Sequence, residues 1–107
     1  MKEIITTTSE TVPNKKIVEI LGIVRGNTIR ARHVGRDIMA GFKNLVGGEI
    51  KSYTDLISQA RDEAFNRMVN EAIDLKADAI INVRFTSSTV MQGASEILAF
   101  GTAVKLK

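Results

Sequence analysis

A long amphipathic helix is the feature that most limits how this chain can fold. Between Thr54 and Lys76, apolar residues stand at positions 56, 57, 60, 64, 65, 68, 69, 72 and 73, the spacing of a helix with one broad apolar face. Ser52 or Thr54 is expected to cap its start. One such helix in a chain of 107 residues predicts a single domain, residues 1–107, built around that apolar face.

The other apolar segments predict strands on either side of this helix. Residues 4–8 form a short β-prone start, and residues 16–31 predict a long strand. Gly22 and Gly26, inside the long strand, predict a bulge or the close approach of another backbone. Residues 79–90 and 95–106 predict two strands of a hairpin that turns at Gln92-Gly93.

Both strands of the predicted hairpin are apolar on both faces. Alternation along the first strand groups Ala79, Ile81, Val83 and Phe85 on one face. Along the second strand it separates Leu98, Phe100 and Val104 from Ile97, Ala99 and Ala103. One helix covers only one face of a sheet, so we expect a second subunit to cover the other.

A second, shorter helix is predicted from His33 to Val46 by the spacing of its apolar residues. Gly47-Gly48 is expected to end that helix at its C-cap. The predicted order is therefore ββααββ, an α+β fold in which an antiparallel sheet packs against one long and one short helix. An alternative role for the two glycines is a small anion nest beside the long helix, although the spacing of a phosphate-binding loop is absent.

The charge is uneven along the chain, although the net charge is only +3. Residues 1–52 carry nine Lys and Arg against five Asp and Glu, whereas residues 53–107 carry six against seven. Arg25, Arg30, Arg32 and Arg36 stand in a stretch without any acid. This pattern is typical of a solvated strand edge, and the alternative is an anion-binding face.

Arg61 is the charged residue that fits its predicted helix least well. At about 100° per residue it projects between Met68 and Ala72, on the apolar side. A charge there must be paired or reach solvent, and Glu49 and Glu96 are the candidate partners. Two interpretations stay open: a structural ion pair, or an anion-binding arginine in a cleft between subunits.

Metal ligands are few in this sequence. The chain has no Cys and one His, and His33 with Asp37 four residues later supplies two of the three or four ligands that a tight transition-metal site needs. In a symmetric oligomer, each copy could contribute these ligands to one site on the symmetry axis. A metal ion therefore stays open as a cofactor, with His33 and Asp37 as the candidates.

Other function classes have little support from the residues. The single His has no evident nucleophile partner, which argues against an enzyme. With no Trp, one Tyr and no interleaving of basic and aromatic residues along the chain, a nucleic-acid partner is not expected. The absence of Cys, of an apolar run of about 20 residues and of a signal peptide predicts a cytoplasmic protein with no membrane partner.

Several blocks of sequence occur in the order found in a known family. They are TTT near the start, GIVRG (22–26), RDIMAG (36–41), VGGEIKSY (46–53), AR (60–61), ADAI (77–80) and GTAV (101–104). Over nearly the whole chain they resemble the YbjQ-like family of small prokaryotic proteins, whose function is uncharacterised and which often carry a heavy-metal-binding label. The resemblance implies a two-layer, dodecin-like subunit and a homo-oligomeric ring, a pentamer. It implies no activity.

One segment departs from that family pattern. Some members have an acidic stretch on the strand after the long helix, whereas residues 82–87 here contain one Arg and no carboxylate. That strand therefore offers no carboxylate ligands for a metal in this chain.

These observations together predict a homo-oligomeric binding or scaffold protein. Its ligand, a small anion or a metal ion, is expected at subunit interfaces near residues 32–53, with Arg36, Glu49 and Arg61 as ligand-binding residues. The alternatives are a purely structural assembly partner for another protein, and an enzyme on small phosphorylated or acidic substrates in which Arg36 and Arg61 clamp the anion.

Overall fold

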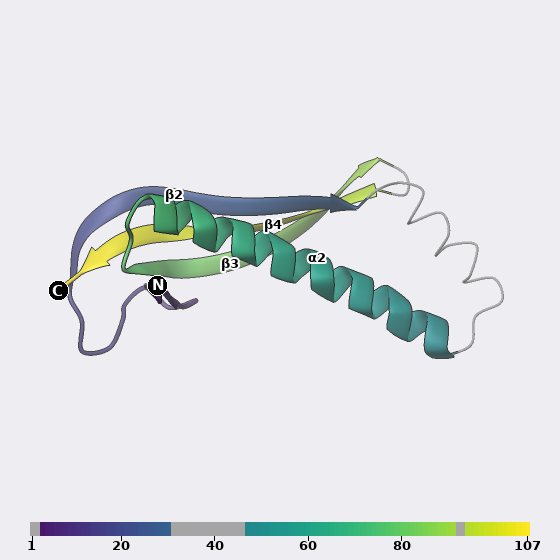
Figure 1. The fold of residues 1–107 in the computed structure, drawn as a ribbon, viewed down its shortest axis with the longest axis horizontal. Helices are drawn as coiled ribbons and strands as arrows, with labels where there is room; N and C mark the ends of the chain where they lie inside the picture. The colour runs from purple at the N-terminus through teal and green to yellow at the C-terminus, as the bar shows by residue number, and fades with distance from the viewer. Residues whose placement is uncertain (1–2, 31–46, 92–93) are drawn as a thin grey trace.

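The fold is a four-stranded sheet with a long helix on one face (Figure 1). The computed structural model describes residues 3–30, 47–91 and 94–107. The elements are β1 (Ile5–Thr6), β2 (Ile17–Arg30), α2 (Gly47–Asp74), β3 (Ala79–Met91) and β4 (Ala94–Leu106). The predicted short helix over residues 33–46 and the predicted turn at residues 92–93 lie outside the described residues.

The sheet is mixed, whereas the sequence predicted an antiparallel one. Its strand order is β1-β3-β4-β2. The β2–β4 and β3–β4 pairs are antiparallel, as predicted for the hairpin, but β1 pairs with β3 in parallel through two residues. The α+β class and the two layers are confirmed.

Helix α2 begins earlier than the sequence predicted. Both glycines of the pair Gly47-Gly48 lie in its first turn, seven residues before Thr54. The prediction that this pair forms a loop between two elements, with Ser52 or Thr54 as cap, is therefore wrong.

The two glycines of β2 have the two roles that the sequence predicted. Gly22 has a φ of +132° and lies at a shift of register between β2 and β4, which is a bulge. Gly26 lies under α2, where an added Cβ would overlap the helix backbone at Ala64 and Met68. The absence of a side chain at Gly26 therefore allows the helix to approach the strand closely.

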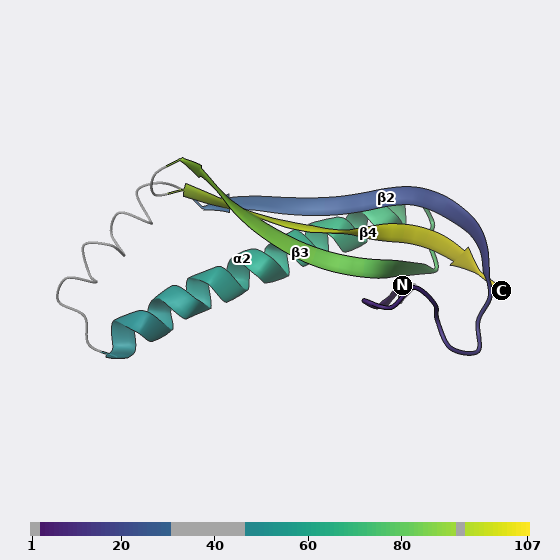
Figure 2. The same cartoon turned by 180° about the vertical axis from the view of Figure 1, so that it is seen from behind.

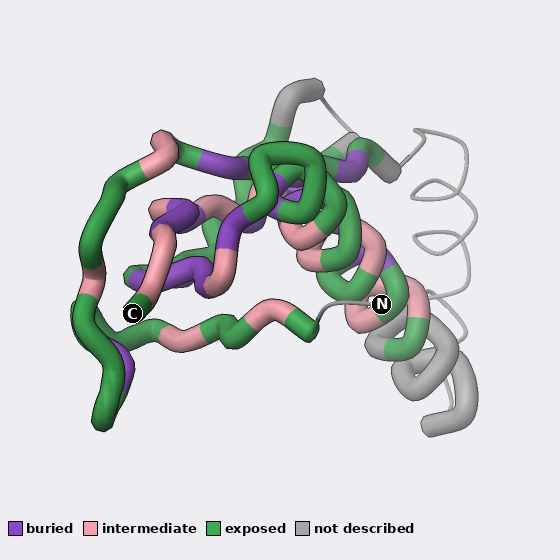
Figure 3. Tube along the Cα trace, turned by 60° about the vertical axis from the view of Figure 1, so that its left-hand side comes forward, coloured by how far each residue is buried: buried purple, intermediate pink, exposed green. Residues whose placement is uncertain are grey.

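The buried stripe of α2 follows one row of residues spaced by four. Ala60, Ala64, Met68 and Ala72 are all fully buried against the sheet. Such a row advances about 40° around the helix with each step of four residues, so the helix crosses the strands at an angle. Figure 3 shows the buried residues gathered where α2 lies against the strands.

A bulge in β3 changes which side chains share a face. Ile81 pairs with Thr102, but the next pair joins Arg84 to Phe100, so β3 has one extra residue here. Asn82, at this point, has a φ of +54°. As a result Val83 joins the cluster under α2, while Ala79 and Ile81 lie in the cluster on the opposite face.

The predicted face of β3 is therefore wrong from the bulge onward. Phe85 follows Val83 to the helix side, where its ring stacks on Phe65 of α2 with centroids 6.3 Å apart. In β4, by contrast, the predicted grouping of Ile97, Ala99 and Ala103 is confirmed. These three residues pack in the cluster under α2, and Val104 packs on the other face.

The second apolar cluster is covered by this chain itself. Val12, in the segment between β1 and β2, is buried against Ala79, Ile81 and Val104. The expectation that a second subunit covers the whole second face is therefore wrong for this part of the sheet. For the rest of that face, cover by a second subunit stays a prediction.

The chain is extended for its length. Its principal extents are 55 × 25 × 24 Å, and its radius of gyration is 17.1 Å, against about 13 Å for a compact domain of this size. The N-terminal half of α2 extends beyond the sheet (Figures 1 and 2). In the part of the chain that the structure describes, no helix is long and apolar enough to span a bilayer.

Candidate functional site

The outer edge of β3 is open over most of its length. Near its start, the N–H of Val83 donates to the carbonyl oxygen of Thr7 at 3.0 Å, pointing away from β4. The structure describes no strand beside residues 84–91 on that side. Because N–H direction alternates along a strand, the N–H groups of Phe85 and Ser87 also point outward. A row of backbone donors and acceptors is thus available to another strand.

Between two register shifts, at Ile81–Arg84 and Thr89–Met91, this edge of β3 carries neither of the two residue types that usually prevent pairing. Residues 85–90 read FTSSTV, with no charge and no Pro. Exposed edges are normally blunted by charged residues, Pro or a bulge, because an uncharged β-prone edge accepts a further strand. Residues 85–89 are all exposed in this chain. The edge is therefore suited to strand addition.

The opposite border of the sheet is β2, which exposes four large apolar side chains. Their exposed fractions are 51% for Val18, 70% for Ile20, 74% for Ile23 and 57% for Ile29. These side chains are spaced along β2, with Arg25 and Asn27 between Ile23 and Ile29, and a strand added beside β2 would bury them through cross-strand contacts. The two borders of the sheet, β2 and β3, therefore both offer surfaces that a partner can bury.

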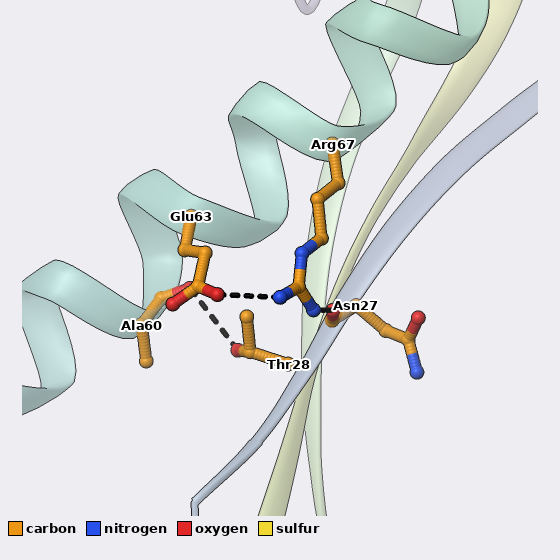
Figure 4. A network of polar contacts seen from close by, with 5 residues as sticks. All are labelled: Asn27, Thr28, Ala60, Glu63 and Arg67. Carbon is orange, nitrogen blue, oxygen red and sulfur yellow. Dashed lines mark hydrogen bonds and ion pairs between the residues drawn. The ribbon is translucent and has the colours of Figure 1, made fainter.

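A polar network between α2 and β2 is structural (Figure 4). The hydroxyl of Thr28, which is buried, donates to the carbonyl oxygen of Ala60 at 3.1 Å. The Arg67 guanidinium donates to the carbonyl oxygen of Asn27 at 2.6 Å and forms an ion pair with Glu63 at 2.5 Å. These contacts fix the helix on the strand and cover one carbonyl of the β2 edge.

Arg61 does not occupy the position that its helical projection predicted. It is exposed, and its Nη2 donates to the Ser58 hydroxyl at 3.1 Å, one turn earlier on the same helix. Glu96, one candidate partner, instead accepts a hydrogen bond from the amide of Asn27; the side chain of Glu49, the other candidate, lies outside the described residues. The buried row of α2 winds around the helix, so the side that faces the sheet changes along its length. At this turn of the helix the residue that faces the sheet is Ala60, and Arg61 points about 100° away from it.

The other predicted ligand residues are not brought together by described contacts. Glu49 lies in the first turn of α2 on the backbone, and its side chain lies outside the described residues. Arg36, His33 and Asp37 also lie outside the described residues. The alternative of an anion nest in a loop at Gly47-Gly48 does not hold, since these glycines belong to the first turn of α2.

The described part of the chain does not fit a metal site. Within residues 3–30, 47–91 and 94–107, no group of three or more His, Cys, Asp or Glu side chains converges on one point. A tight transition-metal site needs three or four such ligands. No metal chemistry can therefore be derived from these residues.

A shallow cavity of about 390 Å³ lies at the C-terminal end of α2. It is lined by Ile4, Ile73, Lys76, Ala77 and Lys105. The Lys105 ammonium is already used, because it donates to the carbonyl oxygen of Lys76 at 2.8 Å. The end of a helix also repels anions through its dipole. This cavity is therefore poorly suited to an anionic ligand.

The open edge of β3 was not identified from the sequence. The uncharged run over residues 85–90 is the signal that was available. However, a strand is recognised as an edge only when its neighbours are known, and the pairing of β3 with β1 stops at Ile80.

Comparison with known proteins gives matches over nearly the full chain. A family model described as "Putative heavy-metal-binding" matches residues 4–107. A UPF0145 protein of Archaeoglobus fulgidus is 62% identical over 106 residues, which cover 99% of this chain and 98% of that protein. A UPF0145 protein of Shewanella frigidimarina is 58% identical over 102 residues, with 95% of each chain covered.

A solved structure supports the fold. A crystal structure of a protein of unknown function from Pediococcus pentosaceus, of the DUF74 family, matches with a TM-score of 0.65. The match covers 97% of this chain and 98% of that one, at 18% sequence identity. At this identity the likeness concerns the fold alone.

Proposed function

Since this chain belongs to the YbjQ family, also named UPF0145, we propose that it is a subunit of a homo-oligomeric scaffold whose copies join through the edges of their sheets. The family's description concerns heavy-metal binding, but its members named above carry no stated activity. The observation that carries the proposal is the open, uncharged edge of β3 over residues 85–91.

The partner strand is proposed to be β2 of a second copy. The two open edges stand on opposite borders of one sheet, so joining β3 of one copy to β2 of the next is a head-to-tail contact. Such contacts close into a ring when the rotation between copies allows it. The family resemblance makes a pentamer the expected size.

The exposed side chains of β2 support this partner. Ile23 and Ile29 lie on the face opposite α2, directly beside the open edge, and a strand added there would bury them through cross-strand contacts. The extended shape of the subunit agrees with an assembly, because the half of α2 that extends beyond the sheet needs another surface to cover it.

The ligand remains the second part of the proposal. A small anion or a metal ion at the interface would be held by Arg36, Glu49 and Arg61, or by His33 and Asp37. Arg61 is exposed on α2 and free to meet a neighbouring copy. A cytoplasmic location is part of the same proposal.

The assembly is tested with a proline on the open edge. Ser87→Pro removes an N–H that points away from β4, so the subunit keeps its own hydrogen bonds but cannot pair there with a neighbour. Ser87→Ala is the matched control, since it keeps the N–H. By sedimentation velocity, we expect the wild type and Ser87→Ala to be oligomers, and Ser87→Pro to sediment near the 11.7 kDa of one chain.

A second control checks the direction of the hydrogen bonds. Ser88 pairs with Glu96 of β4, so Ser88→Pro breaks the subunit's own sheet and should lower its stability. A monomeric wild type, or a Ser87→Pro protein that assembles like the wild type, would refute assembly through this edge.

A further inference from the structure

The register of the sheet brings two arginines to either side of one aromatic ring. Phe100 of β4 pairs with Arg25 of β2 on one side and with Arg84 of β3 on the other. Adjacent strands are about 4.8 Å apart, so the two arginine backbones lie about 10 Å apart with the phenyl ring between them. We call these three residues the Arg–Phe–Arg row.

The row lies on the face opposite α2. Residues next to each member, namely Val24, Ala99 and Val83, are buried in the cluster under the helix. Because side chains alternate along a strand, the row points the other way. Figure 2 shows this face, with the strands in front of α2 and the N-terminal segment beside only one end of them.

The side chains of the row are accessible and carry uncompensated charge. Arg25 and Arg84 are exposed, and Phe100 is partly buried. Among the described residues, Arg25 forms no ion pair. Arg84 Nη1 donates to the carbonyl oxygens of Thr8 at 2.9 Å and Val83 at 2.8 Å, which holds the guanidinium toward the N-terminal segment at the outer edge of β3.

The residues that flank the row on this face supply no carboxylate. On one side the neighbouring positions are Asn27, Leu98 and Thr86, and on the other they are Ile23 and Thr102. The first acid on the face is Glu96, four residues from Phe100 along β4, and it accepts a hydrogen bond from Asn27. The row therefore combines two cations and one ring in a setting that attracts anions.

From this arrangement we infer that the Arg–Phe–Arg row binds a single nucleotide. The base stacks on Phe100 and the phosphate is held by the guanidinium group of Arg25, while Arg84 adds positive charge on the other side of the ring. Heteroaromatic rings stack on aromatic and guanidinium planes, and guanidinium forks match phosphate oxygens.

A mononucleotide fits better than a nucleic-acid strand. Phe100 is the one aromatic side chain on this face among the described residues, since Phe85 stacks on Phe65 on the helix side. A strand needs successive rings to stack its bases, whereas one nucleotide needs one. The proposed edge-to-edge assembly extends the sheet and leaves its face open, so the inference does not depend on it.

The test uses calorimetric titration of the full-length protein at low salt with AMP, GMP and UMP. Adenosine and inorganic phosphate probe the two halves of the ligand. Arg25→Gln and Phe100→Leu change the row, and Lys15→Gln is the charge-matched control, at an exposed residue in the turn before β2. We expect at least tenfold weaker nucleotide binding for Arg25→Gln and Phe100→Leu, no change for Lys15→Gln, and binding of each half-ligand at least tenfold weaker than that of AMP.

Three results would overturn the inference. They are no binding of any nucleotide at millimolar concentration, equal binding by Arg25→Gln and the wild type, and much tighter binding of a ten-nucleotide single strand than of the mononucleotides. If Phe100→Leu does not fold, Arg25→Gln decides the question alone, since its side chain is exposed. Sedimentation of each variant separates a failure of binding from a failure of assembly.

Discussion

Gly26 of β2 lies directly against the backbone of α2 at Ala64. A Cβ added to Gly26 would stand 2.2 Å from the carbonyl oxygen of Ala64 and 2.4 Å from the backbone nitrogen of Met68. Both neighbours are backbone atoms of a helix, which cannot turn aside as a side chain can. The distance between helix and sheet is therefore set by the absence of one side chain.

Gly26→Ala should separate the helix from the sheet or prevent folding. Overpacking at a contact of this kind is expected to cost about 3 kcal/mol of the free energy of unfolding. Gly22→Ala is the control: its Cβ would meet nothing within 4 Å, so any cost there comes from its φ of +132° alone. Urea unfolding of both variants measures this, and a Gly26→Ala protein as stable as the wild type would contradict the close contact.

The buried hydroxyl of Thr28 provides the second prediction. Thr28→Val keeps the shape of the side chain but removes the hydrogen bond to the carbonyl oxygen of Ala60. The Ala60 carbonyl oxygen can still accept its backbone hydrogen bond within α2, so it is not left without a partner. We therefore expect the free energy of unfolding to fall by only about 1 kcal/mol. Thr28→Ser keeps the hydroxyl donor and is the control. Urea midpoints that rise for Thr28→Val would show that the bond contributes nothing.

The elements of this fold could be predicted because each has a local cause. The apolar spacing predicted the long helix, and the glycines of β2 predicted both a bulge and a close approach, which the structure has at Gly22 and Gly26. The start of α2 was missed because a Gly-Gly pair usually ends helices, whereas here it begins one.

The features that depend on three-dimensional register could not be predicted. A helical projection assumes that the same side of α2 faces the sheet along its whole length, so it placed Arg61 beside Met68 and Ala72. In the structure the buried side winds around the helix, and Arg61 is exposed. Likewise, Arg25 and Arg84 are 59 positions apart, and only the register shows that both flank Phe100. Basic and aromatic residues are interleaved across the strands and not along the sequence.

A single chain should not retain zinc. One chain offers His33 and Asp37 as its metal-ligand candidates, and two ligands do not hold zinc tightly. We therefore expect the monomeric Ser87→Pro protein to lose zinc on dialysis, as measured by elemental analysis, whether or not the assembled protein keeps it. One zinc ion retained per monomeric chain would show that a single subunit carries a complete site.

The bulge at Asn82 decides which side chains of β3 face the helix. Asn82 has a φ of +54°, a conformation that Asn tolerates and Gly adopts freely, but that costs other residues about 1 kcal/mol or more. We expect Asn82→Ala to be less stable than Asn82→Gly by about 1 kcal/mol in urea unfolding. Equal stability of the two variants would mean that the strand can shift its register without penalty. In that case Val83 and Phe85 would not be fixed under α2, and Arg84 would lose its place beside Phe100.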